Sequence, residues 1–143
     1  MLQWNEQFET GHALIDTQHK MLISYINQLG GLVHTTNPSR QEAEFVLNLL
    51  SFMETYLNVH FEQEEECMEK YKCPAGQANK EAHRKFTLFF QKFKRQFEME
   101  GFRPEVVKEL HDTCSHWIQE HILQIDTQLK PCINRGSSPG REN

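Results

Sequence analysis

The 143-residue chain is long enough for one domain with a sizeable hydrophobic core. Its 20 acidic residues outnumber its 15 basic ones, and the net charge of −5 argues against general binding to nucleic-acid phosphates, which needs a basic face. No run of about 18 apolar residues is present, so we expect no membrane span. The acidic N-terminus lacks a signal-peptide pattern, and we therefore expect a cytoplasmic protein.

The first part of the chain predicts an arm followed by a helix. Residues 1–13 show no regular periodicity, and we expect Trp4 and Phe8 to anchor this N-terminal arm to the domain. Apolar residues then recur with a helical period from Ile15 to Val33. Residues 36–39 (Thr-Asn-Pro-Ser) end this helix.

Two further helices are expected in the middle of the chain. Ser39 or Asn37 can cap a second helix that runs from about residue 40 to 71. A break at residues 72–76 separates it from a third helix, whose apolar stripe over residues 79–97 is rich in phenylalanine.

A fourth helix completes the predicted domain. Pro104 suits its first position, and its stripe continues from Val107 to Leu129 before Pro131 ends the helix. Four amphipathic helices joined by short breaks predict an all-α, antiparallel up-down-up-down four-helix bundle over residues 1–132. Residues 133–143 contain Gly, Ser and Pro, and we expect a flexible tail, typical of a linker to a downstream domain.

Polar side chains interrupt the apolar face of the second helix. His60 and Glu64 lie four residues apart, on the same helical face as Met53 and Leu57. Burying an unpaired polar group costs about 2–7 kcal/mol, and a metal ion would offset this cost. Taken alone, a paired histidine and glutamate in the core is the more common explanation.

The bundle topology favours the metal. It places the starts of the first and third helices at the same end as the finishes of the second and fourth helices. Six inward-facing polar residues then fall at this one end, within a few helical turns. They are His19, His60, Glu64, His83, His121 and Asp126.

The donor set distinguishes between metals. Six donors are too many for one tetrahedral zinc, and calcium and magnesium prefer oxygen ligands. Mixed nitrogen and oxygen donors suit iron, and two irons bridged by Glu64 and Asp126 would use every donor. A ferritin-like site is a competitor, but it uses Glu-x-x-His pairs, which this chain lacks at these positions.

Three motifs carry a family resemblance. Residues 15–20 (IDTQHK), 60–65 (HFEQEE) and 121–126 (HILQID) resemble the hemerythrin family, its bacterial members in particular, and the resemblance covers residues 4–130. It implies a non-haem di-iron site in a four-helix bundle that binds O2. Carried over, the resemblance assigns one iron to His19 and His60 and the other to His83 and His121, bridged by Glu64, Asp126 and an oxo or hydroxo oxygen.

One position departs from the family pattern. The third helix of the family has two histidines four residues apart, and here Asn79 stands four residues before His83. An amide oxygen is a poor iron ligand, so we expect water or another exchangeable ligand on the iron of His83 and His121. This favours autoxidation, peroxide chemistry or NO reduction over durable O2 carriage.

Three functions are compatible with this reading. The first is a domain that senses O2, NO or redox state, as part of a larger signalling protein. The second is an oxidoreductase that reduces O2, peroxide or NO at open iron positions. The third and least favoured is an O2 carrier or store, or an iron-handling protein.

The remaining residues have weaker interpretations. Trp117, Ile118 and Phe86 could line an O2 pocket, and ordinary core packing explains them equally well. Glu62, Glu65, Glu66 and Glu69 are most simply a solvated helix face, with a supporting role for one of them as the alternative. We expect no ligand role for the other histidines, and reduced thiols in place of a disulfide framework for the cysteines. The residues concerned are His12, His34, His111, His116, Cys67, Cys73, Cys114 and Cys132.

Overall fold

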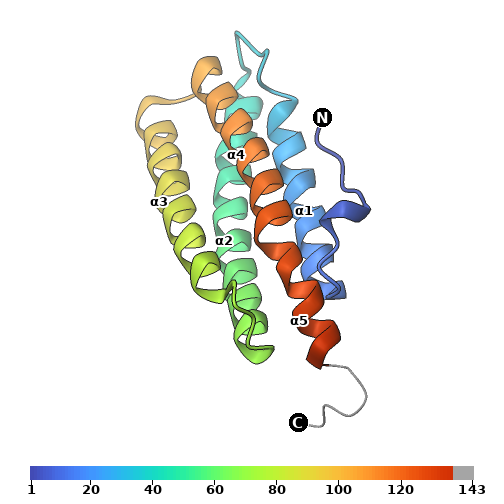
Figure 1. Ribbon diagram of the computed structural model, residues 1–143. Helices are drawn as coiled ribbons and strands as arrows, with labels where there is room; N and C mark the ends of the chain where they lie inside the picture. Colours follow the sequence, from blue (N-terminus) through green and yellow to red (C-terminus); the bar gives the residue numbers. More distant parts are fainter. Residues whose placement is uncertain (137–143) are drawn as a thin grey trace.

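The computed structural model describes residues 1–136, which form an antiparallel four-helix bundle (Figure 1). Its helices are α1 (Ala13–Gly30), α2 (Arg40–Lys70), α3 (Gly76–Glu100) and α4 (Pro104–Gln124). Successive helices run in opposite directions, and α1 and α3 each pack against both α2 and α4. The predicted fold class is therefore confirmed. Among these residues, no helix combines the length and the apolar character needed to cross a membrane.

The helix ends follow from local sequence. The Ser39 hydroxyl accepts a hydrogen bond from the Glu42 backbone N–H at 3.0 Å, and the Glu42 carboxylate accepts one from the Ser39 N–H at 2.8 Å. This capping box satisfies two backbone donors at the start of α2, so Ser39 rather than Asn37 is the cap. At the C-terminal end of α3, Gly101 has a φ of 80°, a conformation that glycine adopts without strain.

The N-terminal arm packs onto the bundle. It contains the short 3-10 helix η1 (Glu6–Phe8), and Phe8 is buried in the main core. Trp4 packs against the same core, and the Lys20 ammonium lies 4.3 Å from the centre of its ring. Trp4 and Phe8 thus anchor the arm, as expected from the sequence.

The fourth helix ends earlier than predicted. It stops at Gln124, the 3-10 helix η2 (Asp126–Gln128) follows, and the separate helix α5 (Leu129–Gly136) contains Pro131. The prediction of one helix that continues to Leu129 and ends before Pro131 was wrong. Proline is tolerated in the first turn of a helix, where backbone N–H groups have no intrahelical partner.

The folded chain therefore extends past residue 132. Cys132 is buried and Ile133 is partly buried in a small apolar cluster, and α5 continues to Gly136. The rest of the expected tail and linker, residues 137–143, lies outside the described part of the chain.

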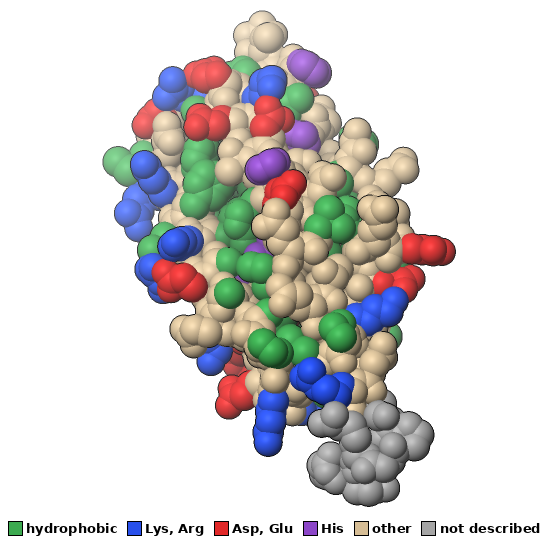
Figure 2. Space-filling view, viewed as in Figure 1, with side chains coloured by type: hydrophobic (Ala, Val, Ile, Leu, Met, Phe, Trp, Pro, Cys, Tyr) green, Lys and Arg blue, Asp and Glu red, His purple; other side chains and the backbone are tan. Residues whose placement is uncertain are grey.

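Two apolar clusters flank a polar layer. The larger fills most of the bundle and includes the buried phenylalanines of α3. The smaller lies at the end where α2 turns into α3 and where α5 begins, and it contains Ile15, Cys67, Met68, Cys73, Ala75, Leu129 and Cys132. The residues between these clusters along each helix are the inward-facing polar ones, so they are enclosed on both sides. On the outer surface, acidic and basic side chains are interspersed over the face seen in Figure 2.

Candidate metal centre

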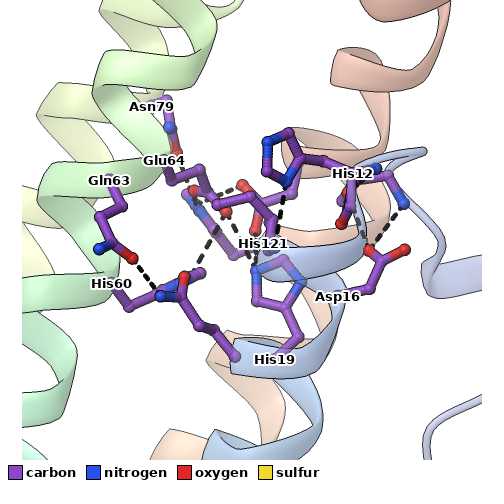
Figure 3. Close-up of polar contacts among 12 residues, drawn as sticks. His12, Asp16, His19, His60, Gln63, Glu64, Asn79 and His121 are labelled. Atoms are coloured by element: carbon purple, nitrogen blue, oxygen red, sulfur yellow. Dashed lines mark hydrogen bonds and ion pairs between the residues drawn. The ribbon is translucent and has the colours of Figure 1, made fainter.

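The six inward-facing side chains predicted from the sequence meet at one end of the bundle. All four main helices and η2 contribute, and no member is more than 5% exposed. Figure 3 shows four labelled members facing one another: His19 from α1, His60 and Glu64 from α2, and His121 from α4. The cluster consists of His19, His60, Glu64, His83, His121 and Asp126.

Glu64 lies at the centre of this cluster. Its Oε2 atom is 3.0 Å from Nε2 of His19 and 3.4 Å from Nε2 of His60. Its Oε1 atom is 3.1 Å from Nε2 of His83 and 3.9 Å from Nε2 of His121. The two oxygens of one carboxylate therefore face two different pairs of imidazoles.

Asp126, in η2, makes similar contacts with two histidines. Its Oδ2 atom is 3.1 Å from Nε2 of His19, and its Oδ1 atom is 3.0 Å from Nε2 of His121. In a continuous α-helix, residues 121 and 126 would point about 140° apart. The end of α4 at Gln124 removes this conflict, because η2 turns the Asp126 side chain back toward the core.

The buried donors fit a metal better than they fit one another. Three carboxylate oxygens, Oε1 of Glu64 and both oxygens of Asp126, lie beside imidazoles yet accept no hydrogen bond of normal geometry. The Nε2 atoms of His83 and His121 are 3.1 Å apart and face each other. Two nitrogens bound to one ion at about 2.1 Å and at right angles would be separated by about 3 Å. A cation would satisfy groups that are otherwise costly to bury.

The electrostatics of the cluster favour positive charge. Burial opposes a charged His19, but its contacts with Asp126 and Glu64 outweigh burial and raise its pKa to about 10. Burial would raise the pKa of Glu64, but contacts with the surrounding histidines hold it well below its ordinary value. Glu64 is thus ionised at neutral pH, and protons and metal ions compete for the site.

Comparison with known proteins identifies the family. Residues 10–133 match the model of the hemerythrin HHE cation binding domain, which covers most of the chain. The chain belongs to the hemerythrin family. The resemblance found in the three sequence motifs is thereby confirmed, and a cation-binding role agrees with the buried donors.

Bacterial hemerythrins are similar over nearly their whole length. The bacteriohemerythrin of Stenotrophomonas maltophilia (strain R551-3) is 29% identical over 139 residues, which cover 94% of this chain and 86% of the relative. That of Pseudomonas paraeruginosa (strain DSM 24068 / PA7) is 27% identical over 137 residues, covering 96% and 84%. That of Clostridium acetobutylicum (strain ATCC 824) is 23% identical over 128 residues, covering 90% and 98%.

Two glutamines form a hydrogen-bond chain to His60, one of the cluster histidines. The Nδ1 atom of His60 lies 2.7 Å from Oε1 of Gln18, and the Gln18 amide in turn donates to Gln63. If Nδ1 carries the proton, Nε2 of His60 keeps its lone pair for the centre of the cluster. We did not expect this network from the sequence. The available signal was that each glutamine directly precedes a candidate ligand, His19 or Glu64.

Three further side chains hold the histidines on the other side. Nδ1 of His83 lies 2.8 Å from the carboxylate of Glu65, which is thus more than part of a solvated helix face. The Phe61 ring stacks on His83 with centroids 3.8 Å apart, and Trp117 stacks on His121 at 4.4 Å. These contacts fix the ring orientations, and the role of Phe61 was not apparent from the sequence.

Asn79 is buried and faces the cluster. Its Oδ1 atom lies 2.8 Å from Nε2 of His121, and its amide nitrogen has no hydrogen-bond partner. It therefore occupies the side of the site formed by His83 and His121, as its position on the third helix predicted.

Trp117, Ile118 and Phe86 line one small cavity. The cavity has a volume of about 10 Å³, barely enough for one water molecule, and its other walls are apolar core residues. Trp117 lies between Phe86, whose centroid is 4.0 Å away, and His121. The cavity therefore adjoins the cluster through the Trp117 ring.

The other four histidines have different roles. His12 caps the start of α1 by accepting from the Ile15 N–H, and His111 contacts Asp112 at 3.0 Å. His34 and His116 are exposed. None of them belongs to the cluster.

Proposed function

We propose that the chain binds two non-haem iron ions in this cluster. His19 and His60 would hold one ion and His83 and His121 the other, with Glu64 and Asp126 placed to bridge them. The observation that supports this assignment is the division of each carboxylate, with one oxygen toward each pair of imidazoles. A single ion could not use donors that face in two directions.

Iron is the metal that suits these donors. The number of donors exceeds what one zinc ion accepts, and the imidazoles argue against calcium and magnesium. Bound iron would supply a redox-active centre that can bind O2 or NO. The protein supplies the ligands, orients them through Gln18 and Glu65, and keeps water away with the rings of Phe61 and Trp117.

We propose that the cavity beside Trp117 receives the diatomic ligand. Its walls are apolar and its volume of about 10 Å³ matches only a very small molecule. An apolar diatomic gas loses little by leaving water for such a space, whereas water would find no hydrogen-bond partners. Phe86 and Ile118 also line this cavity, which lies within the larger apolar cluster.

Within this function we favour a sensor over a catalyst. Asp126 contacts His19 and His121 from η2, and η2 leads directly into α5. A change of ligand or oxidation state that shifts Asp126 would therefore be transmitted to α5. Sensing at such a site requires only a two-state element biased by the ligand.

A di-iron oxidoreductase is the second candidate, and Asn79 is the observation that favours it. The amide oxygen of Asn79, rather than an imidazole, lies beside His121. A weakly donating side chain leaves a position for an exchangeable ligand, which is the condition for reducing O2, peroxide or NO.

The experiment is an iron count with optical spectra before and after exposure to air. The proposal predicts about two irons per chain and near-ultraviolet bands that change with oxidation. Sustained consumption of a reductant with O2, peroxide or NO would favour the oxidoreductase, and binding without turnover would favour the sensor. Colourless protein that is free of iron and indifferent to chelators would overturn both.

A further inference from the structure

Three of the four cysteines gather outside the metal cluster. Cys67 on α2, Cys73 in the turn between α2 and α3, and Cys132 on α5 belong to the smaller apolar cluster. All four cysteines are free thiols, and Cys114 lies apart from the other three, in the larger core. In Figure 1 the turn that carries Cys73 and the helix α5 lie at the same end of the bundle.

Cys73 lies beside the start of α5, the helix that carries Cys132. The Cys73 Sγ atom donates to the Gln128 carbonyl at 3.4 Å, and Gln128 immediately precedes α5. Cys132 lies four residues further, one helical turn away on the same face. Burial raises the pKa of Cys73, and the side-chain contact with Cys132 raises it further, so little of Cys73 is thiolate at neutral pH and we expect its oxidation to be slow. Cys67 makes no such side-chain contact with Cys73 among the described interactions.

The two thiols differ in their access to solvent. Cys73 lines a surface groove of about 290 Å³ between α2 and the start of α3, and Lys72 and Lys80 also line this groove. Both thiols are buried, but Cys73 is 8% exposed and Cys132 only 3%. Cys73 is thus the more accessible of the two, and we infer that a small polar oxidant meets it before Cys132.

We propose that Cys73 and Cys132 are an oxidisable thiol pair whose reactant is a peroxide such as hydrogen peroxide. The Cys73 thiolate attacks one peroxide oxygen; the S–O bond forms, the O–O bond breaks, and the leaving hydroxide takes up a proton to give water. The Cys132 sulfur then attacks the Cys73 sulfenic acid, forming the S–S bond and releasing a second water. In total, two thiols lose two electrons and two protons, and one peroxide becomes two waters.

The resulting disulfide would tie the α2–α3 turn to α5. Because α5 directly follows η2, the bond would restrain the segment that carries Asp126. The thiol chemistry itself needs no metal, so this inference stands or falls separately from the proposed iron site.

The test uses the full chain, reduced and then treated with stoichiometric hydrogen peroxide. Free thiols are alkylated, the protein is digested with trypsin without reduction, and the linked peptides are sequenced by mass spectrometry. We expect the peptide that begins at Cys73 to be joined to Cys132. Diamide, which oxidises dithiols without peroxide, should give the same link.

Variants separate the pair from the other cysteines. Cys67→Ala and Cys114→Ala should keep the link, and Cys132→Ala should abolish it and leave a dimedone-reactive sulfenic acid on Cys73. Cys67→Ala is the matched control for packing, because it removes a buried thiol from the same cluster. A link between Cys73 and Cys67, oxidation of Cys67 ahead of Cys73, or no disulfide with either oxidant would overturn the proposal.

Discussion

The side-chain oxygen of Gln18 lies 2.7 Å from Nδ1 of His60, across the interface between α1 and α2. An imidazole that donates through Nδ1 presents its Nε2 lone pair to a metal. The contact therefore fixes both the tautomer and the orientation of His60, and it links the two helices that form one side of the centre.

The first prediction concerns this contact. Gln18→Ala should weaken ferrous iron binding by about 10- to 100-fold, because the ligand His60 loses its supporting acceptor. Gln18→Glu keeps an acceptor and should retain most of the affinity. Gln28→Ala, an exposed position on the same helix, is the control. Competition with a chelator measures the affinities, and an unchanged affinity in Gln18→Ala would rule out this role.

The second prediction concerns the bridging carboxylate. Glu64→Gln keeps the shape of the side chain but removes its charge, and the proposed bridge requires that charge on both sides. We expect less than one iron per chain after purification, measured by iron analysis and protein quantification. Glu62→Gln on the exposed face of α2 should bind iron normally. A variant that lost only one iron would mean that Glu64 serves one ion.

The third prediction concerns Asn79. Asn79→His supplies an imidazole four residues before His83, on the side of the cluster where Asn79 contacts His121. We expect autoxidation to slow by about tenfold, a barrier change of about 1.4 kcal/mol, because the exchangeable position is filled. Asn79→Ala removes the amide without adding a ligand and should stay fast. Stopped-flow spectroscopy after mixing with oxygenated buffer measures the rates, and equal rates in all three proteins would show that this position does not control reactivity.

The fourth prediction concerns protons in the metal-free protein. The pKa of His19 rises from 6.5 to about 10 on folding, because its ion pairs with Asp126 and Glu64 outweigh burial. A raised pKa stabilises the folded state fully below pH 6.5, and this stabilisation is lost as the pH rises toward 10. The free energy of unfolding should therefore fall through this window, by about 1.4 kcal/mol per pH unit for one proton. His83, whose pKa is also raised by Glu64 and Glu65 against the effect of burial, acts in the same direction.

Urea denaturation of the metal-free protein measures this slope, best in the lower half of the window, where cysteine thiols are still protonated. His19→Gln should flatten it, and iron loading should also flatten it because metal displaces the proton. Stability that is constant or rises over this range in the metal-free protein would contradict the assignment. Burial lowers the pKa of His60, and its opposite contribution is confined to pH values below 6.5.

Much of the fold was predictable because the helical stripes are regular. The phenylalanines of α3 and the capping residue Ser39 lie where the sequence pattern places them. Helical periodicity also predicts that His19, His60 and His83 lie at one end of the bundle, because alternating helix directions determine which helix ends coincide. These are local signals that a single sequence contains.

The break after α4 was not predictable from the same signals. The stripe of apolar residues continues to Leu129, yet a continuous helix would turn Asp126 away from His121. The five-residue spacing was itself the sign of a break, because only an interrupted helix brings both side chains inward. The contacts of Gln18, Phe61 and Glu65 depend on pairing between helices, which the sequence of one helix does not specify.

The most direct test of the account is anaerobic titration of the metal-free chain with ferrous iron, followed by oxidation and magnetic measurement. Two ions that share Glu64 and Asp126 should bind to a stoichiometry of two per chain and couple to each other, so that the oxidised protein gives no strong ferric electron paramagnetic resonance signal. Binding of a single iron, or of two irons that behave as isolated ferric centres, would contradict a shared site.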